Sequence, residues 1–276
     1  MKNKEEVSRL YCAAMRILYP CDPLETRKPD EVYSDEYSAA REAGLSVGLF
    51  SYEDFLTGSF RCRPALEPGE QVLYRGWMMT PEEYQSLANE IGERSGSLLV
   101  TPEQYRLCHH LPEWNPALQK FTAETQIFPA GSDYAAGLAD TRWPAYFVKD
   151  YVKSNSSGRG SLAANPNEIA DIVAAIEKYR GHVEGGVCVR RGEIYLPDSE
   201  KRYFVVHGRV CARDEVLPEI VNQAAKLIES CFFSVDVALR NDQEWRIIEL
   251  GDGQVSDRKM WTVEEFIPIL TSLSTL

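Results

Sequence analysis

Two apolar stretches, residues 234–239 and 244–250, flank a short polar loop and predict an antiparallel β-hairpin. With residues 241–244 as the loop, the register places Asp236 directly opposite Glu249. Opposed side chains on neighbouring strands have Cβ atoms about 4.5–5.5 Å apart, and like charges at that spacing destabilise a sheet. We therefore expect a positively charged group to lie between the two acids of this hairpin.

The other face of this hairpin is apolar, because the same register pairs Val237 with Ile248 and Val235 with Leu250. A hard divalent cation with oxygen ligands is the simplest partner for the acidic face, and Mg²⁺ is usual where phosphates share the coordination. Asp252, just beyond the strand, is a candidate for a further ligand. A solvent-facing strand pair with two incidental acids is the alternative.

A lysine-bearing strand and a loop of small residues form a second polar feature. The apolar strand 145–149 ends in Lys149, and Lys153 and Ser154 lead into the Gly/Ser-rich loop 154–161. Such a lysine supplies a positive charge beside backbone N–H groups that can bind phosphate oxygens. The P-loop spacing is absent, so an ordinary linker remains an alternative.

Arginines on apolar strands form a third feature. Arg190 and Arg191 end the predicted strand 185–191, and Arg202 begins the predicted strand 202–206. An arginine on such a strand either faces solvent or pairs with a carboxylate or phosphate, and the residues alone leave both open. The four histidines have no metal-ligand spacing.

Helices and strands are expected along the whole chain. Strands are predicted at 16–19, 45–50, 71–75, 97–100, 145–149, 185–191, 202–206, 209–214 and the two hairpin segments, and helices at 5–15, 35–43, 167–179, 215–231 and after the N-cap residues Thr80 and Thr101. Residues 106–142 are rich in aromatic residues and proline, and they predict a helical or irregular bridge. The sequence thus predicts an α/β lobe, a bridge and an α+β region.

Composition excludes several classes of protein. The formal net charge of −12, from 42 acidic and 30 basic residues, argues against broad contact with nucleic-acid phosphates. No run of about 18 apolar residues predicts a membrane span, and the first residues do not resemble a signal peptide, so we expect a cytoplasmic protein. The seven cysteines are widely spread and are expected to be free thiols.

The order of these parts resembles the ATP-grasp superfamily across residues 143–257: a strand lysine, a small-residue loop, a hinge strand, an arginine strand, and strands carrying an Asp and a Glu. More narrowly, residues 74–78, 101–105, 148–154 and 249–256 resemble a divergent bacterial clade of that superfamily. This clade is grouped with the eukaryotic cell-division-cycle protein that helps to assemble a translation initiation factor.

The resemblance implies an α+β fold in which two lobes grip ATP, preceded by an α/β pre-ATP-grasp lobe. It divides the chain into a pre-grasp lobe (1–105), a bridging segment (106–142) and a nucleotide-binding region (143–276). It also implies ATP and Mg²⁺ as ligands.

Roles for individual residues follow from the same resemblance. Lys149 would contact the α- and β-phosphates, and Lys153 with Ser154 and its loop would cover them. The adenine would lie against the hinge strand. Arg190 and Arg202 would stabilise the transferred phosphoryl group. The hinge residues concerned are Cys188, Val189 and Arg190.

For the metal, the resemblance implies Asp236 and Glu249 as Mg²⁺ ligands. Most members have Glu-x-Asn on the second metal strand, whereas this chain has Gly251 in place of the asparagine, so Asp252 is the candidate substitute. Arg75 would either bind a substrate carboxylate or hold the loop that carries Trp77, and these two roles are equally open.

The implied activity is that of an ADP-forming carboxylate–amine ligase, in which a carboxylate attacks the γ-phosphate and an amine attacks the acyl phosphate. The acceptor is unidentified and could be a small metabolite, a peptide or a protein side chain. Two alternatives remain: an ATP-bound assembly factor with little turnover, and a phosphotransferase that stops at phosphoryl transfer.

Overall fold

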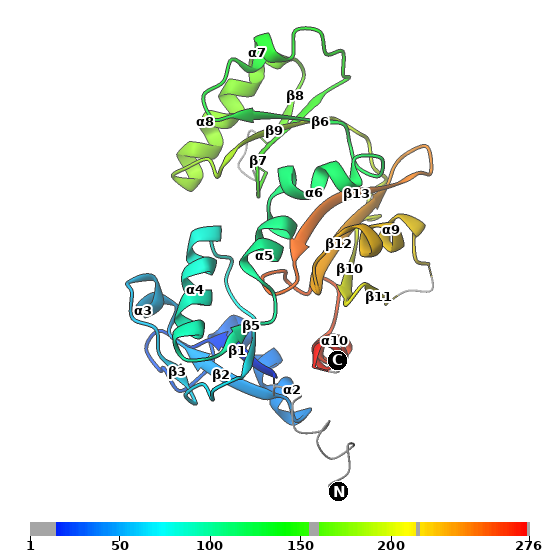
Figure 1. Ribbon diagram of the computed structural model, residues 1–276. Coiled ribbons are helices and arrows are strands. Elements are labelled where there is room, and N and C mark those ends of the chain that lie inside the picture. Colours follow the sequence, from blue (N-terminus) through cyan, green and yellow to red (C-terminus); the bar gives the residue numbers. More distant parts are fainter. Residues whose placement is uncertain (1–14, 155–159, 214–215, 275–276) are drawn as a thin grey trace, which may run out of the picture.

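The computed structural model describes residues 15–154, 160–213 and 216–274, and it contains three β-sheets with helices packed against them (Figure 1). We name the parts built on these sheets the N-terminal, middle and C-terminal lobes. The mixture of helices and sheets agrees with the predicted α+β class. Among the described residues, no helix combines the length and the apolar character that crossing a membrane requires.

The N-terminal lobe is built on a five-stranded sheet of order β3-β2-β1-β4-β5, in which only β3 is antiparallel. Its elements are β1 (Met15–Pro20), η1 (Glu31–Tyr33), α2 (Ser34–Glu42), β2 (Ser46–Phe50), α3 (Tyr52–Leu56), β3 (Cys62–Arg63), β4 (Gln71–Tyr74), α4 (Pro81–Glu93), β5 (Ser97–Leu98) and α5 (Pro102–His109). The four predicted strands are therefore confirmed. The predicted helix 5–15 lies outside the described residues except for Met15, which begins β1.

Local signals in this lobe act as the sequence predicts. Thr80 and Thr101 each accept a hydrogen bond from the backbone of the third helical residue, and the side chain of that residue bonds back to the threonine N–H. Gly44 follows α2 with a φ of +80°, a conformation that side-chain-bearing residues rarely adopt. These caps begin α4 and α5 and end α2 at the expected positions.

The middle lobe has an antiparallel sheet of order β6-β9-β7-β8. Its elements are β6 (Thr125–Pro129), α7 (Tyr134–Gly137), β7 (Tyr146–Asp150), β8 (Leu162–Ala163), η2 (Pro166–Glu168), α8 (Ile169–Arg180) and β9 (Gly186–Arg191). The segment 106–142 thus contains a sheet strand besides its helices. The short edge strand β6 has no fully buried residue, so no strong apolar pattern marks it in the sequence.

The C-terminal lobe has an antiparallel sheet of order β11-β10-β12-β13. Its elements are β10 (Lys201–Val206), β11 (Arg209–Cys211), α9 (Glu219–Leu227), β12 (Phe232–Leu239) and β13 (Trp245–Asp252), and helix α6 (Leu111–Leu118) shares its core. Positive φ angles at His207 and Gly208 (48° and 72°) confirm the predicted hairpin turn. Helix α9 begins only after Pro218, because a proline disfavours helical backbone angles in the residue that precedes it.

The predicted hairpin register is correct at the acids and at the pair Val235–Leu250, and it is wrong on the loop side of the acids. Asp236 pairs with Glu249 as expected, whereas Val237 faces Ile247 instead of Ile248, because a β-bulge shifts the register at this point. The carbonyl of Ile248 instead accepts a hydrogen bond of 2.7 Å from Arg190 Nη1 on the middle lobe.

The last helix, α10 (Val263–Leu273), joins the N- and C-terminal lobes. In Figure 1 it lies beside α2 and below the C-terminal sheet. Phe266 of α10 packs against Phe204 of β10, with ring centroids 4.9 Å apart, and both belong to the hydrophobic core of the N-terminal lobe. The middle lobe has a separate core between its sheet and α8.

Candidate functional site

Two neighbouring cavities lie between the lobes. Pocket A has a volume of about 490 Å³ and is lined by the N-terminal lobe, the turn after β7, β13 and the loop that follows it. Pocket B has a volume of about 390 Å³ and is lined by β7, β8, the end of β9, the linker 192–200 and β13. The cavities meet at β13, since Ile248 lines pocket B and Glu249 lines pocket A.

Lys149 and Glu249 face each other at this junction. Lys149 Nζ lies 2.7 Å from Glu249 Oε1, and the lysine is 4 % exposed while the glutamate side chain is 40 % exposed. In the register of β7 and β9, Lys149 pairs with Cys188 and Phe147 with Arg190, so these four side chains share the face turned away from α8. The middle lobe therefore directs Lys149 toward the acids of the C-terminal lobe.

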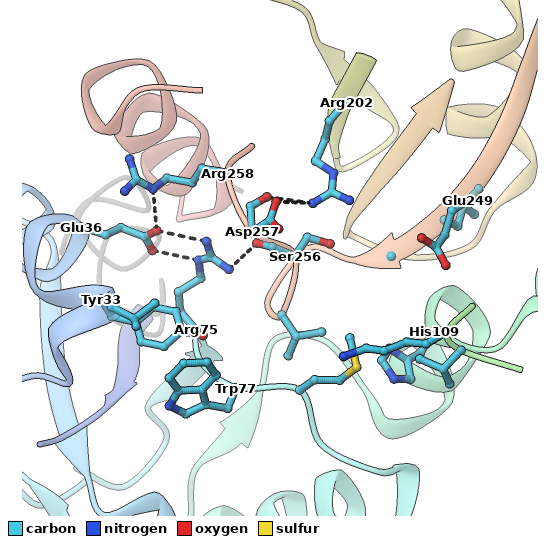
Figure 2. A pocket seen from close by; sticks show the side chains of 17 residues that line it. Tyr33, Glu36, Arg75, Trp77, His109, Arg202, Glu249, Ser256, Asp257 and Arg258 are labelled. Atoms are coloured by element: carbon cyan, nitrogen blue, oxygen red, sulfur yellow. Dashed lines mark hydrogen bonds and ion pairs between the residues drawn. The ribbon is translucent and has the colours of Figure 1, made fainter. Parts of the chain in front are cut away.

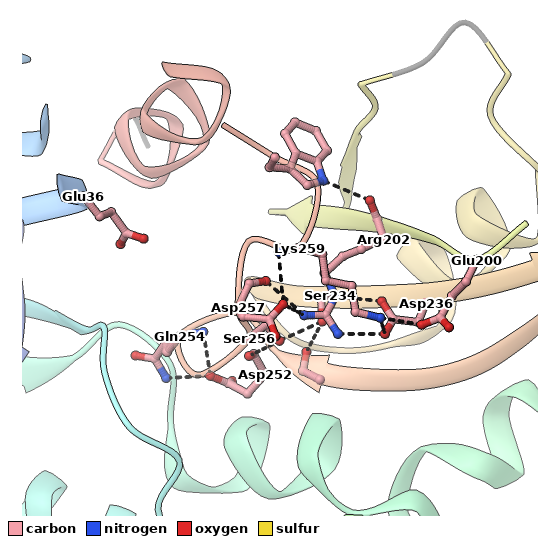
Figure 3. A network of polar contacts seen from close by, with 12 residues as sticks. Glu36, Glu200, Arg202, Ser234, Asp236, Asp252, Gln254, Ser256, Asp257 and Lys259 are labelled. Atoms are coloured by element: carbon pink, nitrogen blue, oxygen red, sulfur yellow. Dashed lines mark hydrogen bonds and ion pairs between the residues drawn. The ribbon is translucent and has the colours of Figure 1, made fainter. Parts of the chain in front are cut away.

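Asp236 lies within a cluster of basic side chains (Figure 3). Arg202 makes a bidentate contact with both its oxygens, each at 2.7 Å, and Lys259 Nζ lies 2.8 Å from Oδ2. Burial by itself would raise the pKa of Asp236, but Arg202 and then Lys259 outweigh burial and hold that pKa below its ordinary value. The carboxylate is ionised and neutralised by two cations.

The opposed carboxylates of Asp236 and Glu249 are the candidate ligands for a divalent cation, and in this structure both oxygens of Asp236 are bound by Arg202 and Lys259. Each carboxylate is neutralised by basic groups, and Glu249 is partly exposed toward pocket A. No cluster of three or more His, Cys, Asp or Glu side chains with metal-binding geometry occurs within residues 15–154, 160–213 and 216–274. Mg²⁺ is commonly bound by one or two carboxylates, with substrate phosphates and water completing the shell, so a cation at this position would have to replace part of these ion pairs.

Asp252 lies on the opposite face of β13 from Glu249, because residues three apart on a strand point in opposite directions. It is fully buried and accepts hydrogen bonds of 3.0 Å from the backbone N–H and side-chain amide of Gln254. The prediction that Asp252 replaces the missing metal ligand does not agree with this position. The sequence suggested it only through its nearness along the chain.

Burial raises the pKa of Asp252 to about 7, despite the hydrogen bonds from Gln254. Between pH 3.8, its ordinary pKa, and about pH 7 the Asp252 carboxyl is ionised in the unfolded chain and protonated in the folded chain, so the free energy of unfolding falls as pH rises through this window.

We expect Asp252→Asn to remove this loss of stability with rising pH. Relative to the wild type, the free energy of unfolding of the variant should grow by a few kcal/mol from pH 5 to pH 8, at about 1.4 kcal/mol per pKa unit. Urea unfolding at both pH values tests this, and a constant difference would contradict it.

Arg75 is a buried link between lobes. It is 2 % exposed and binds both oxygens of Glu36 on α2, at 2.8 and 3.1 Å. Its Nη1 donates to the carbonyls of Gln254 and Ser256, at 3.0 and 2.7 Å, as Figure 2 shows for Ser256. Because protein groups occupy these donors, the predicted capture of a substrate carboxylate is not favoured. The alternative role needs correction as well, since Arg75 holds the loop 254–256 and not the loop of Trp77.

Lys153 is exposed and lines pocket A. The carboxylate of Asp150 accepts hydrogen bonds from the backbone N–H groups of Val152 and Lys153, at 2.8 and 2.6 Å, and so forms a tight turn directly after β7. Ser154 then forms an isolated bridge back to Lys149. Residues 155–159 of the predicted phosphate loop lie outside the described part of the chain.

Of the three residues predicted for the hinge, only Arg190 lines pocket B. Val189 packs into the core under α8 and Cys188 is buried between the lobes, and neither residue lines pocket B. Arg190 does line it, and its Nη1 and Nη2 donate to Ile248 O and to Thr122 Oγ1. The hinge part of pocket B is formed by residues 190–193, so one of the three predicted hinge residues, Arg190, lies on this pocket.

Several residues of the site were not found by the sequence reasoning. They include Tyr33, Trp77, His109, Asp257, Arg258 and Lys259. Burial lowers the pKa of His109 to about 4, so its imidazole is neutral at pH 7. A usable signal was the run Asp257-Arg258-Lys259, three charges directly after the glutamate strand.

Comparison with known proteins identifies a related domain. Residues 141–270 match the family model of the ATP-grasp domain, R2K clade family 3. No curated protein gives a significant match. The bacterial clade predicted from the sequence is therefore supported, whereas its relation to the eukaryotic assembly protein stays a prediction.

Solved structures resemble almost the whole chain. D-cycloserine synthetase DcsG has a TM-score of 0.62 at 13 % identity, with 95 % of this chain and 99 % of that chain covered. The ATP-grasp ligase PsnB, complexed with minimal precursor, Mg and ADP, has a TM-score of 0.60 at 13 % identity, with 95 % and 99 % covered. A RiPP-associated ATP-grasp ligase from Chryseobacterium gregarium has a TM-score of 0.56 at 12 % identity, with 94 % and 95 % covered. The predicted fold is thereby confirmed.

Proposed function

We propose that this chain, a member of the ATP-grasp superfamily, is an ATP- and Mg²⁺-dependent ligase that activates a carboxylate as an acyl phosphate for attack by an amine. The observation that carries the proposal is the order of the two cavities. Pocket B, whose lining surface is mainly apolar, a junction of opposed acids and bases, and a mixed polar and apolar pocket A follow one another across β13. The bound reactants would follow the same order, with the adenosine in pocket B, the charged phosphates at the junction and the acceptor in pocket A.

In this proposal the adenosine occupies pocket B. Phe147, Leu162 and Ile248 offer apolar surface to the base, and the linker residues Asp198 and Ser199 offer polar groups to the sugar. The triphosphate then extends toward β13 and the turn after β7.

The phosphates lie at the junction. Lys149, Lys153 and Ser154 contact phosphate oxygens from the middle lobe, and Arg202 does so from the C-terminal lobe. Arg190 orients the bulged strand beside the nucleotide through Ile248. Lys149 and Glu249 neutralise each other in the structure. With ligands bound, Lys149 would instead pair with a phosphate oxygen and Glu249 with a divalent cation.

Asp236 and Glu249 would hold Mg²⁺, which supplies charge stabilisation for the transferred phosphoryl group. A carboxylate oxygen in pocket A forms a bond to the γ-phosphorus, and the bond to the β–γ bridging oxygen breaks, releasing ADP. The amine nitrogen then bonds to the acyl carbon, the carbon–oxygen bond to phosphate breaks, and the amine loses a proton. Arg202 and Lys153 stabilise the negative charge that moves between these groups.

Two of the similar structures support an acceptor that includes peptides. PsnB is described in complex with a minimal precursor, and the ligase from Chryseobacterium gregarium in complex with a leader and core peptide. At 13 % and 12 % identity these likenesses establish the fold alone, so the acceptor must be inferred from this chain's own residues.

Calorimetric titration of ATP with and without Mg²⁺ tests the proposal. We expect Mg²⁺ to tighten ATP binding at least about tenfold, which corresponds to about 1.4 kcal/mol of metal-dependent contacts at the junction. With carboxylates and hydroxylamine present, the nucleotide should return as ADP and the carboxylate as a hydroxamate. A stable phosphorylated product would instead identify a phosphotransferase. ATP that returns intact under all conditions would favour an assembly factor.

A further inference from the structure

Pocket A has an apolar rim on its N-terminal side. Val32, Trp77 and Met78, which we call the apolar ledge, are 59 %, 38 % and 36 % exposed and all line the pocket. Figure 2 shows the Trp77 indole beside Tyr33, with which it makes an edge-on contact at 5.4 Å between ring centroids. The Trp77 N–H donates to Asp30 at 3.1 Å, so the indole is oriented although much of it remains exposed.

The backbone beneath the ledge is held by three tyrosine hydroxyl groups. The carbonyls of residues 77, 78 and 79 accept hydrogen bonds from Tyr74 (2.5 Å), Tyr52 (3.2 Å) and Tyr105 (2.7 Å), in that order. Tyr105 also accepts from the N–H of residue 79, at 3.0 Å. Exposed loops are commonly mobile, so a loop fixed at three successive carbonyls presents its apolar side chains at a low entropic cost of binding.

Exposed apolar groups in fixed positions beside a cavity indicate a binding surface, because their exposure to water otherwise only lowers stability. The opposite side of pocket A has the complementary character. Lys153 lines the pocket and has no ion-pair partner among the residues that the structure describes, whereas Arg202 and Arg258 on the same pocket are each paired with carboxylates. The ammonium group of Lys153 can therefore pair with an anionic group of a ligand.

We propose, on the basis of the function given above, that the acceptor is a peptide segment in which an apolar side chain lies next to the carboxylate that is activated. The carboxylate enters from the side of Lys153 and Arg202, and the apolar side chain packs on the ledge. A cavity of about 490 Å³ lies within the range of about 300–1,000 Å³ that is typical of ligand-binding pockets. The ledge lies at the rim, where a chain that continues out of the pocket would pass.

Two blocked pentapeptides with a central glutamate test this inference, one with leucine on both sides of the glutamate and one with glycine. Their affinities for the protein are measured by calorimetry in the presence of Mg²⁺ and a non-hydrolysable ATP analogue, so that no chemistry is required. We expect the leucine peptide to bind at least about tenfold more tightly, as burial of part of one leucine side chain predicts. Equal affinities, or no binding of either peptide, would overturn the inference.

Variants of the ledge connect this preference to its residues. Trp77→Ala is expected to reduce the ratio of the affinities for the leucine and glycine peptides from about ten to about one. Val32→Asp should act in the same direction, and its side chain is 59 % exposed, so a folding defect does not confound the result. Leu24→Ala is the matched control, because Leu24 is 94 % exposed and does not line pocket A. A preference that survives both ledge variants would refute the assignment.

Enzymatic turnover separates this inference from the proposed function. If small carboxylates such as free glutamate yield ADP and a hydroxamate while neither peptide binds, the ligase function stands and the peptide acceptor is wrong. If the leucine peptide binds through the ledge but no carboxylate yields ADP, the peptide site stands and the ligase function is wrong.

Discussion

Replacement of Arg75 by alanine is expected to lower the free energy of unfolding by about 3–5 kcal/mol, because it leaves the buried carboxylate of Glu36 without its main partner. Glu36 is 2 % exposed, and both of its oxygens bind the Arg75 guanidinium. The variant also removes the two hydrogen bonds from the Arg75 side chain to the carbonyls of Gln254 and Ser256. The loss therefore combines an unpaired buried charge with two broken links between lobes.

Urea unfolding followed by tryptophan fluorescence measures this effect. Lys28→Ala is the control, because Lys28 and Glu25 form an ion pair with both side chains more than half exposed, and exposed pairs contribute little. The double variant Arg75→Met with Glu36→Gln removes both charges and should recover part of the loss. If Arg75→Ala unfolds at the wild-type urea concentration, the pair does not hold the lobes together.

Glu249→Gln is expected to reduce Mg²⁺-dependent ATP turnover at least about 100-fold, which is about 2.7 kcal/mol of transition-state stabilisation. Glutamine keeps the shape of the side chain and an oxygen that can accept a hydrogen bond from Lys149, which lies 2.7 Å from Glu249 in the structure. It lacks the negative charge that would hold a divalent cation between β12 and β13. The side chain is 40 % exposed, so the fold should tolerate the change.

The measurement is ADP release as a function of Mg²⁺ concentration, with the midpoint of urea unfolding recorded for the same samples. Glu264→Gln makes the same chemical change at an exposed position of α10 and should behave like the wild type. Asp236→Asn is expected to act in the same direction as Glu249→Gln, but it also deprives Arg202 and Lys259 of their counter-ion. Retention of the wild-type Mg²⁺ dependence in both acid variants would remove these residues from the metal site.

Sequence periodicity located most of the strands and helices because it reflects local physics. The threonine caps before α4 and α5 are complete within four residues, and the register at Asp236 and Glu249 depends only on alternation along two strands joined by a short loop. Where the signal was weak, as in the half-exposed edge strand β6, the prediction missed the strand.

Predictions from the alternation of side chains along a strand were wrong where a bulge shifted the register or where a residue lay on the other face of the strand. The bulge after Asp236 frees the carbonyl of Ile248, and nothing in the side-chain pattern announces it. Asp252 follows Glu249 closely in the chain but points to the other side of the sheet. The sequence reasoning therefore grouped Glu249 and Asp252 as candidate ligands, although the two residues lie on opposite faces of β13.

The sequence by itself determined the order of the parts, the acidic hairpin and the lysine strand, since each of these depends on neighbours within about twenty residues. Only the tertiary structure decided which charges meet. Lys149 lies opposite a glutamate 100 positions away, and Arg75 binds Glu36 across 39 positions together with the loop after β13. Periodicity states which face of an element is buried, but the partner on that face depends on how the lobes pack, which is a property of the whole chain.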